Sequence, residues 1–305
     1  MSMMVINPDE SRKALGDLDT GDSAASSNIV PDFLDWAENS LEYQKFSGLH
    51  GDIPGYEFAV LALKFLLVAY CAEFGLDPAD VLVVDWGSHT GDNTARLKEL
   101  GARIIGVDIN EEVVEIANEE YGDKTTEFLQ VGQDSPIPDS IKNADIVTAF
   151  FLHPTFKTVK ELYEQIKRIE STMKPGAILM MMGLNPECFK FGKFISYNLP
   201  TPPEEGWPAG YRFTNTLVNN IGRKLSFPDT FFPNTTMRDA FIAAGLIPTI
   251  LSVNDTLDKS AFRTPFEEMK QRIKDQGITL WQELLFGLHQ IYIGKKPGEI
   301  AKLEG

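Results

Sequence analysis

The chain has 305 residues, of which 43% are hydrophobic, so it is long enough to bury the core of one large α/β domain with an appendage. Its formal net charge of −16 argues against DNA or RNA as a substrate, because phosphate contacts need clusters of Lys and Arg. Two cysteines are too few for a disulfide framework and no signal peptide is recognisable, so a reducing, cytoplasmic location is expected.

The N-terminal part is predicted to lie outside the main domain. Residues 1–30 are expected to be a disordered tail, because the chain there is polar and rich in Asp, Ser and Gly. Residues 31–76 are expected to form a helical cover, with helices over Pro31–Phe46 and Tyr56–Phe74. The second helix is apolar but short for a bilayer, and Lys64 interrupts it, so a buried helix is predicted and no membrane span.

Val81–Asn110 is the most informative stretch of the sequence. An apolar run of four residues precedes Asp85, a turn containing two glycines follows, and a second apolar run, Ile104–Val107, ends in Asp108. This order of buried strand, glycine turn, helix and strand closed by an acid is typical of a nucleoside-binding half of a doubly wound sheet.

The turn itself reads Asp85-Trp-Gly87-Ser88-His89-Thr-Gly91 and lacks the G-x-G-x-x-G spacing of dinucleotide-binding folds. An acid two residues before the first glycine would repel a pyrophosphate, but it suits a ligand whose nearby end carries an ammonium group. The turn resembles the D/E-x-G-x-G-x-G motif of the class I S-adenosylmethionine-dependent methyltransferases. His89 stands where that family has its middle glycine.

The resemblance continues in order along the chain. It implies that Asp108 bonds both ribose hydroxyls, because a carboxylate accepts two O–H donors. Gly132-Gln133-Asp134, after a strand at Glu127–Val131, resembles the motif whose acid accepts from the adenine amino group. Ala144–Pro154 resembles the fourth strand and the loop that faces the methyl donor, and Met173–Gly176 resembles the turn into the fifth strand.

The family resemblance therefore implies that residues 77–305 form a methyltransferase domain with S-adenosylmethionine as cofactor and S-adenosylhomocysteine as product. The expected fold is a seven-stranded, mostly parallel, Rossmann-like sheet whose last strand runs antiparallel beside the fifth. No metal site is expected. The residues expected to bind the cofactor are Asp85, Gly87, Ser88, His89, Gly91, Asp108, Ile109, Gln133, Asp134 and Phe150.

Other roles for the acids stay open. Asp85 is an alternative cap for the helix near Gly91, although its offset is long for an N-cap. Asn110 is a better N-cap than Asp108 for the helix expected over Asn110–Glu120, which leaves Asp108 for a ligand. Asp139 and Asp145 are alternatives to Asp134.

The later elements follow from apolar runs and helical spacing. Strands are expected at Ala177–Met182, Ile247–Val253 and His289–Gly294. Helices are expected at Lys157–Met173, Thr235–Ala244 and Pro265–Gln276.

The insertion at residues 184–234 is expected to set substrate choice. It holds seven prolines, which predict an irregular backbone, and ten aromatic residues that it can bury. One interpretation is an aromatic lid over an apolar or planar substrate, because a loop this long is commonly functional. The alternative is that the aromatics are the insertion's own core or a dimer contact.

A general base is needed only if the acceptor must lose a proton, and histidine is the expected type near neutral pH. His153 is the best candidate for catalysis or substrate contact, because it follows the strand Ile146–Leu152 and precedes Pro154 at the edge where doubly wound folds bind ligands. Its alternative role is in a turn before the next helix. His50 is expected in a loop, and His289 is expected to be structural.

The predicted function is methyl transfer to a small molecule, first to an oxygen of a hydroxyl or carboxylate on an apolar or aromatic secondary metabolite. Nitrogen and carbon acceptors stay open, as does a homodimer. Three competing hypotheses are a nicotinamide-dependent oxidoreductase, a protein that binds S-adenosylmethionine without methylating, and a methyltransferase acting on protein or RNA. The sequence Phe150-Phe-Leu-His-Pro154 weakens the last, because it lacks the N/D-P-P-Y/F pattern of amino-group methylation.

Overall fold

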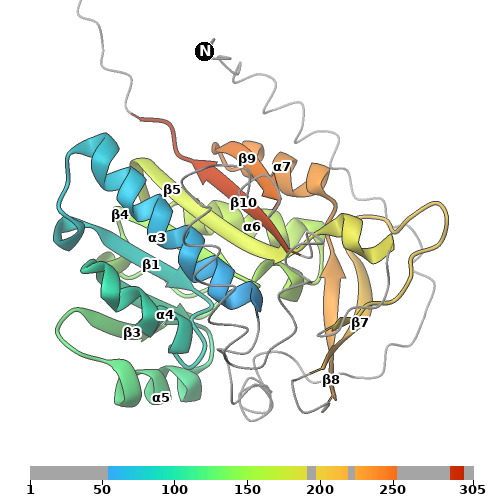
Figure 1. Cartoon of the computed structure of the whole chain (residues 1–305), viewed down its shortest axis with the longest axis horizontal. Helices are drawn as coiled ribbons and strands as arrows, with labels where there is room; N and C mark the ends of the chain where they lie inside the picture. The colour runs from blue at the N-terminus through green and yellow to red at the C-terminus, as the bar shows by residue number, and fades with distance from the viewer. Residues whose placement is uncertain (1–53, 191–196, 219–223, 253–288, 299–305) are drawn as a thin grey trace, which may run out of the picture.

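The computed structural model describes residues 54–190, 197–218, 224–252 and 289–298 (Figure 1). The tail, the helices expected over Pro31–Phe46 and Pro265–Gln276, and His50 lie outside the described residues. The helices are α3 (Pro54–Phe74), α4 (Asp92–Arg96), α5 (Glu111–Tyr121), α6 (Val159–Glu170) and α7 (Asn234–Ala243). Short 3₁₀ turns are η2 (Pro78–Asp80), η3 (Leu97–Leu100), η4 (Asp139–Ile141), η5 (His153–Thr155) and η6 (Pro186–Lys190).

The strands of the main sheet are β1 (Leu82–Trp86), β2 (Arg103–Asp108), β3 (Thr126–Gln130), β4 (Ala144–Phe150), β5 (Met173–Leu184), β9 (Ile247–Ser252) and β10 (His289–Lys295). Their order is β3-β2-β1-β4-β5-β10-β9. The strands from β3 to β5 are parallel, whereas β10 runs antiparallel to both β5 and β9 (Figure 1). The predicted seven-stranded α/β sheet, with its antiparallel last strand beside the fifth, is confirmed.

Helices cover both faces of this sheet. Val83 and Ile146 point to one face and join a buried cluster with Leu67 of α3. The next residue of each strand, Val84 or Val147, joins a second cluster, which contains buried residues of α6 and α7. Because successive side chains of a strand alternate between faces, strands buried on both sides have continuous apolar runs. This is why the central strands were recognisable in the sequence.

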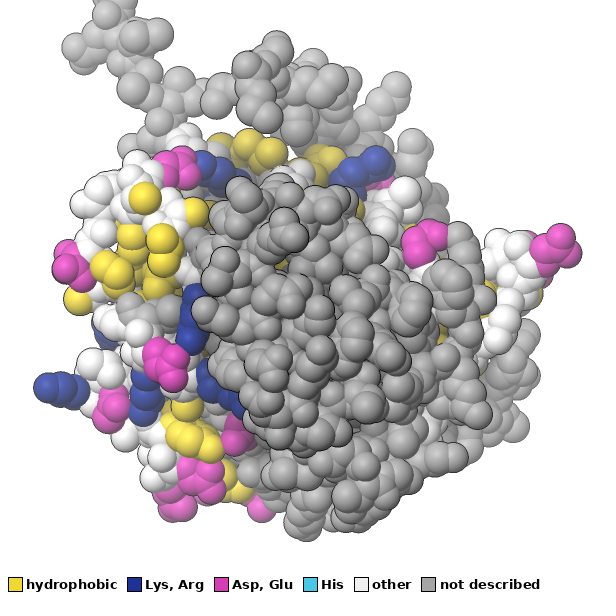
Figure 2. All heavy atoms as spheres, viewed as in Figure 1, with side chains coloured by type: hydrophobic (Ala, Val, Ile, Leu, Met, Phe, Trp, Pro, Cys, Tyr) yellow, Lys and Arg dark blue, Asp and Glu magenta, His cyan; other side chains and the backbone are white. Residues whose placement is uncertain are grey.

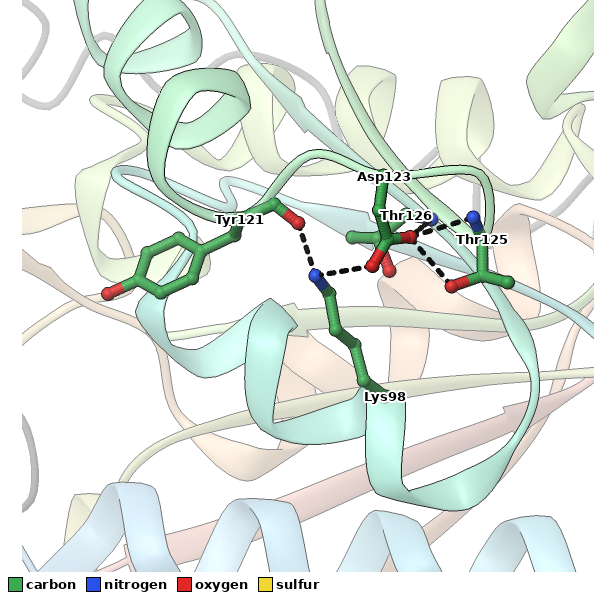
Figure 3. Close-up of polar contacts among 5 residues, drawn as sticks. All are labelled: Lys98, Tyr121, Asp123, Thr125 and Thr126. Atoms are coloured by element: carbon green, nitrogen blue, oxygen red, sulfur yellow. Dashed lines mark hydrogen bonds and ion pairs between the residues drawn. The ribbon is translucent and has the colours of Figure 1, made fainter.

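A polar cluster fixes the turn from α5 into β3 (Figure 3). Asp123 Oδ1 accepts hydrogen bonds from the backbone N–H groups of Thr125 and Thr126, at 2.7 and 2.9 Å. Its other oxygen accepts from Lys98 Nζ of η3 at 3.0 Å, and the same Nζ donates to the carbonyl of Tyr121 at the end of α5. The hydrogen bonds from the hydroxyl and then the backbone N–H of Thr125, followed by Lys98, hold the pKa of Asp123 below its usual range. The cluster thereby holds η3 against the C-terminal end of α5.

Charges of both signs are interspersed over the described part of the surface shown in Figure 2. Several charged residues of the described chain form ion pairs, such as Lys64–Glu99 at 2.7 Å and Arg103–Glu127 at 3.1 Å. Pairs as exposed as these contribute little stability individually. Among the described helices, none combines the length and the apolar character needed to cross a bilayer.

The insertion at residues 184–234 contains regular structure, so the prediction of an irregular backbone is wrong. It contains a three-stranded antiparallel sheet, in the order β6 (Tyr197–Asn198), β7 (Tyr211–Val218) and β8 (Lys224–Phe231). Pro228 lies within β8, opposite Thr214 of β7. Since β8 is an edge strand of this sheet, a residue without an N–H is tolerated there. The other prolines of the insertion lie outside the strands.

Candidate functional site

The turn between β1 and α4 is held against the end of β2. The N–H groups of Gly87 and Ser88 donate to the carbonyl of Val107 at 2.8 and 3.0 Å. Three residues of the turn have left-handed backbone conformations: Gly87 with φ +75°, His89 with φ +52° and Gly91 with φ +85°. The predicted glycine turn is therefore a tightly wound loop at the carboxyl edge of the sheet.

Gly91 is required by packing as well as by its backbone angle. A Cβ at this position would lie 2.7 Å from Phe128 Cζ and 3.1 Å from the Cβ of Ala117. His89 adopts the left-handed conformation that the family's glycine would favour, although this is uncommon for other residues. Its backbone N–H donates to Asp108 Oδ2 at 2.9 Å. Histidine at this position is therefore compatible with the left-handed turn.

Asp108, the last residue of β2, is partly exposed and held by two backbone groups. Oδ2 accepts from His89, and Oδ1 accepts from the N–H of Asn110 at 3.0 Å. A carboxylate oxygen can accept two hydrogen bonds, so each retains acceptor capacity. Asn110 caps α5 by accepting from the N–H of Glu112 at 2.9 Å, which confirms its predicted role. Next to Asp108, Ile109 is 46% exposed and presents an aliphatic surface.

Asp85 is buried, and its carboxylate joins three elements. Oδ2 accepts from Thr94 Oγ1 of α4 at 2.5 Å, and Oδ1 accepts from Thr148 Oγ1 of β4 at 2.6 Å. Burial raises the pKa of Asp85, although both threonine hydrogen bonds oppose this effect. The role of Asp85 beside an ammonium group stays a prediction. Sequence reasoning missed both threonines, although Thr148 visibly interrupts the apolar run of β4.

The loop after β3 is held by α6. Gln133 and Asp134 are exposed there. Arg168 Nη2 donates to the carbonyl of Ser135 at 2.6 Å, and Gln133 Nε2 donates to Glu161 Oε1 at 3.4 Å. Arg168 was not anticipated from the sequence. It fixes the backbone of the segment for which the family resemblance implies adenine binding.

The two alternatives to Asp134 lie in other surroundings. Asp145 is buried near the start of β4, at the edge of the sheet opposite to Asp108. It accepts from the hydroxyl of Tyr70 at 3.1 Å and from a backbone N–H of β1, and it pairs with Lys174. Asp139, the first residue of η4, is exposed and pairs with Lys142, which follows η4. Asp145 is thus distant in the sheet from the predicted cofactor residues.

His153 lies where the sequence predicts it, in η5 directly after β4 and close to Phe150. It is 4% exposed, and its ring meets that of Tyr292 edge to face at 5.5 Å. A Cβ on Gly183 of β5 would lie 2.1 Å from the ring, so glycine leaves the space that the ring occupies. Burial lowers the pKa of His153 to about 3, so the ring is neutral and a weak base near pH 7. This weakens its predicted role as a general base, while contact with a substrate stays a prediction.

The aromatic residues of the insertion partly form their own core. Phe189 and Phe213 are buried in one cluster, with Trp207 packed against them. The insertion also packs on the carboxyl edge of the main sheet, since β8 contacts η5. A cavity of about 20 Å³ lies at this contact and is lined by residues that include His153, Phe189, Phe213 and Asp229. The aromatic residues thus form part of the insertion's own core, and its role as a lid over a substrate stays a prediction.

Comparisons with known proteins agree with this geometry. Residues 84–181 match a family model described as "Methyltransferase domain". A S-adenosylmethionine-dependent methyltransferase from Clostridium acetobutylicum is 12% identical with a TM-score of 0.53, over 84% of this chain and 99% of that one. The CcbJ methyltransferase from Streptomyces caelestis is 13% identical with a TM-score of 0.51, over 80% and 95%. The sugar N-methyltransferase KedS8 from a Streptoalloteichus species is 13% identical with a TM-score of 0.50, over 84% and 92%. At these identities the likeness shows the fold alone.

Alanine dehydrogenase from Mycobacterium tuberculosis is 29% identical over 130 residues, which is 42% of this chain and 33% of that protein. The chain thus spans about a third of the length of the curated relatives that it matches. The family model assigns residues 84–181 to a methyltransferase domain and not to a dehydrogenase. The sheet order and the turn after β1 agree with that assignment. Residues 84–181 therefore match a methyltransferase domain, and the fold around them is one that solved S-adenosylmethionine-dependent methyltransferases also have.

Proposed function

We propose that this enzyme transfers a methyl group to a small-molecule acceptor, first to an oxygen on an apolar or aromatic secondary metabolite. The observation that carries the proposal is the carboxylate of Asp108. It is held at the carboxyl edge by two backbone N–H groups and retains capacity for two further donors.

The residues around Asp108 fit S-adenosylmethionine as the cofactor. Its two oxygens would accept the ribose hydroxyls, and the exposed side chain of Ile109 would contact the adenine ring. Gln133 and Asp134 would lie along the adenine edge, in the loop that α6 holds. When bound, S-adenosylmethionine supplies an electrophilic methyl group on a sulfonium. The main task of the protein is then to hold the acceptor in line with that methyl group and to exclude water.

The insertion supplies the acceptor side of this proposed site. Its cavity lies against η5, at the edge of the sheet where doubly wound folds bind ligands. Phe189 and Phe213 give it apolar walls, and the neutral ring of His153 gives it a polar one. Because this cavity of about 20 Å³ has room for roughly one water molecule, it would take the polar reacting group of the acceptor and not its apolar part.

Calorimetric titration of S-adenosylmethionine and S-adenosylhomocysteine tests the proposal. We expect both to bind the wild type, and Asp108→Ala to lose about 2 kcal/mol or more, as expected on removal of a charged acceptor. Asp139→Ala, which removes an exposed carboxylate with a side chain 95% accessible, is the matched control and should bind normally. Circular dichroism establishes that each variant is folded. If the folded wild type binds NADH and neither S-adenosyl compound, an oxidoreductase replaces the proposal.

A further inference from the structure

Two polar residues interrupt an aromatic face of the insertion. In the β7–β8 hairpin the register places opposite each other the pairs Tyr211–Phe231, Phe213–Asp229 and Asn215–Phe227. Side chains of paired residues lie on the same face of a sheet. Asp229 and Asn215 therefore occupy positions on a face that otherwise carries the rings of the insertion's core.

Both polar residues are buried, and their hydrogen bonding is incomplete. Asp229 is 5% exposed and Asn215 is 1% exposed. Asn215 Nδ2 donates to Asp229 Oδ2 at 2.8 Å. Within the described ranges, no residue donates to Asp229 Oδ1, and Asn215 Oδ1 has no partner. A buried carboxylate with one spare oxygen is costly, and such departures from good packing occur mostly at functional sites.

The carboxylate opens on the cavity between the insertion and η5. Asp229 and His153 both line this cavity, and Phe189, Phe213 and Phe231 form aromatic walls. Its volume of about 20 Å³ is roughly that needed for one water molecule or one small polar group. Asp229 is the only Asp or Glu among the described residues that line this cavity.

We propose that Asp229 binds the hydroxyl of the methyl acceptor and takes up its proton. This inference rests on the proposed function and narrows it, because a buried carboxylate would repel a carboxylate acceptor and so selects a hydroxyl. Oδ1 accepts the hydrogen bond, and the proton moves to it as the O–H bond breaks. The acceptor oxygen forms the new C–O bond, and the electron pair of the broken C–S bond stays on sulfur. Asn215 is a positioning residue that holds Oδ2.

The protonation behaviour of the two candidate bases supports this assignment. Among the described residues, His153 of η5 lines the same cavity as Asp229, and Arg212 of β7, on the other face of the hairpin, acts on Asp229 only through its charge. Burial raises the pKa of Asp229 to about 7, although Asn215 and Arg212 oppose it. A general base is most effective when its pKa lies near the working pH, which Asp229 meets and His153, with a pKa of about 3, does not.

The test uses phenol as a hydroxyl probe and benzene as its matched apolar control. Each is titrated into the full chain with and without S-adenosylhomocysteine, and binding is followed by NMR of ¹³C-labelled aspartate carboxyl groups. We expect phenol to shift the Asp229 resonance and to bind Asp229→Asn at least tenfold more weakly at pH 8, with benzene unaffected. Asp139→Asn serves as the control for loss of a surface carboxylate.

A pH series separates a binding role from a merely structural one. We expect wild-type affinity for phenol to fall as the pH is lowered through about 7, when Asp229 becomes protonated. Asn215→Ala should move this midpoint upward, because it removes the donor that favours the charged form. If phenol binds equally to wild type and Asp229→Asn, fails to bind the wild type, or leaves the Asp229 resonance unchanged, the proposal is overturned.

Failure of the proposal for Asp229 can be distinguished from failure of the proposed function. Binding of S-adenosylhomocysteine is measured separately and tests the cofactor site, whereas phenol without that compound reports on the cavity between the insertion and η5. Circular dichroism and thermal unfolding show whether Asp229→Asn is folded. We expect it to be folded, because it replaces a buried charge with a neutral group of the same shape.

Discussion

At the residue scale, Gly91 and Gly101 both have a left-handed backbone but differ in how closely other atoms pack around them. Gly91 has φ +85°, and a Cβ there would lie 2.7 Å from a ring carbon of Phe128. Gly101 has φ +77°, and a Cβ there would have no atom within 4 Å. Substitution of Gly101 therefore measures the free-energy cost of a left-handed backbone alone. Substitution of Gly91 measures that cost together with the crowding beneath the cofactor turn.

We expect Gly101→Ala to lower the free energy of unfolding by about 1–2 kcal/mol, as for a non-glycine residue in a left-handed conformation. Gly91→Ala should cost about 1–3 kcal/mol more, because the methyl group forces Phe128 to move. Urea unfolding measures both. Adding Phe128→Leu to Gly91→Ala should restore part of the loss, and equal losses for the two glycine variants would contradict the crowding argument.

The sequence was informative about residues whose role is local and less so about residues whose partners are distant in the chain. Asp108 and Asn110 could be assigned because their partners are near them in the turn and the helix cap. Thr148 was missed because its partner, Asp85, is 63 residues away. Asp229 had a usable signal, a polar residue on an aromatic strand face, but the prolines concealed the strand itself.

At the element scale, α6 connects the adenine loop to the core. Arg168 spans this connection, since its Nη2 bonds the carbonyl of Ser135 and its guanidinium lies 5.8 Å from the ring centre of Trp86 in β1. Burial lowers the pKa of Arg168, although attraction to Asp134 opposes this effect. The helix thereby fixes the loop through Arg168, which lies outside the Gly132-Gln133-Asp134 motif and cannot be recognised from it.

We expect Arg168→Met to weaken binding of S-adenosylhomocysteine by about tenfold, about 1.4 kcal/mol, because the loop loses a charge-assisted hydrogen bond. Lys160→Met changes the same helix at a side chain that is 79% exposed and should leave the affinity unchanged. Calorimetry measures both affinities. Unchanged binding in a folded Arg168→Met would place the 132–135 loop outside the cofactor site.

The helices and strands, like the single residues, could be predicted where their pattern is local in the sequence. The central parallel strands are apolar on both faces, and the predicted ranges overlap β1 to β4. The fifth strand was predicted as Ala177–Met182 but extends over Met173–Leu184, through a proline and a glycine that usually end strands. Composition alone could not predict β7 and β8, because their pairing depends on a neighbouring strand rather than on local spacing.

At the scale of the whole molecule, the two edges of the main sheet carry residues with different roles. The carboxyl edge carries Asp108 and His153, which the proposed function uses. Near the amino edge, Asp145 accepts from the hydroxyl of Tyr70 in α3 and from the N–H of Leu82 in β1, and pairs with Lys174 in β5. This buried carboxylate joins a covering helix to three strands, which makes it a determinant of stability at a distance from the proposed chemistry.

Loss of Asp145 should therefore change stability and leave cofactor binding intact. We expect Asp145→Ala to lower the free energy of unfolding by about 3 kcal/mol, because it leaves buried donors and a lysine without their partner. Tyr70→Phe removes one donor only and should cost about 1 kcal/mol. Urea unfolding measures the losses, and calorimetry of the folded variants at low temperature measures S-adenosylhomocysteine affinity. A large loss of affinity in folded Asp145→Ala would show that the two edges are coupled, and would contradict the division of roles between them.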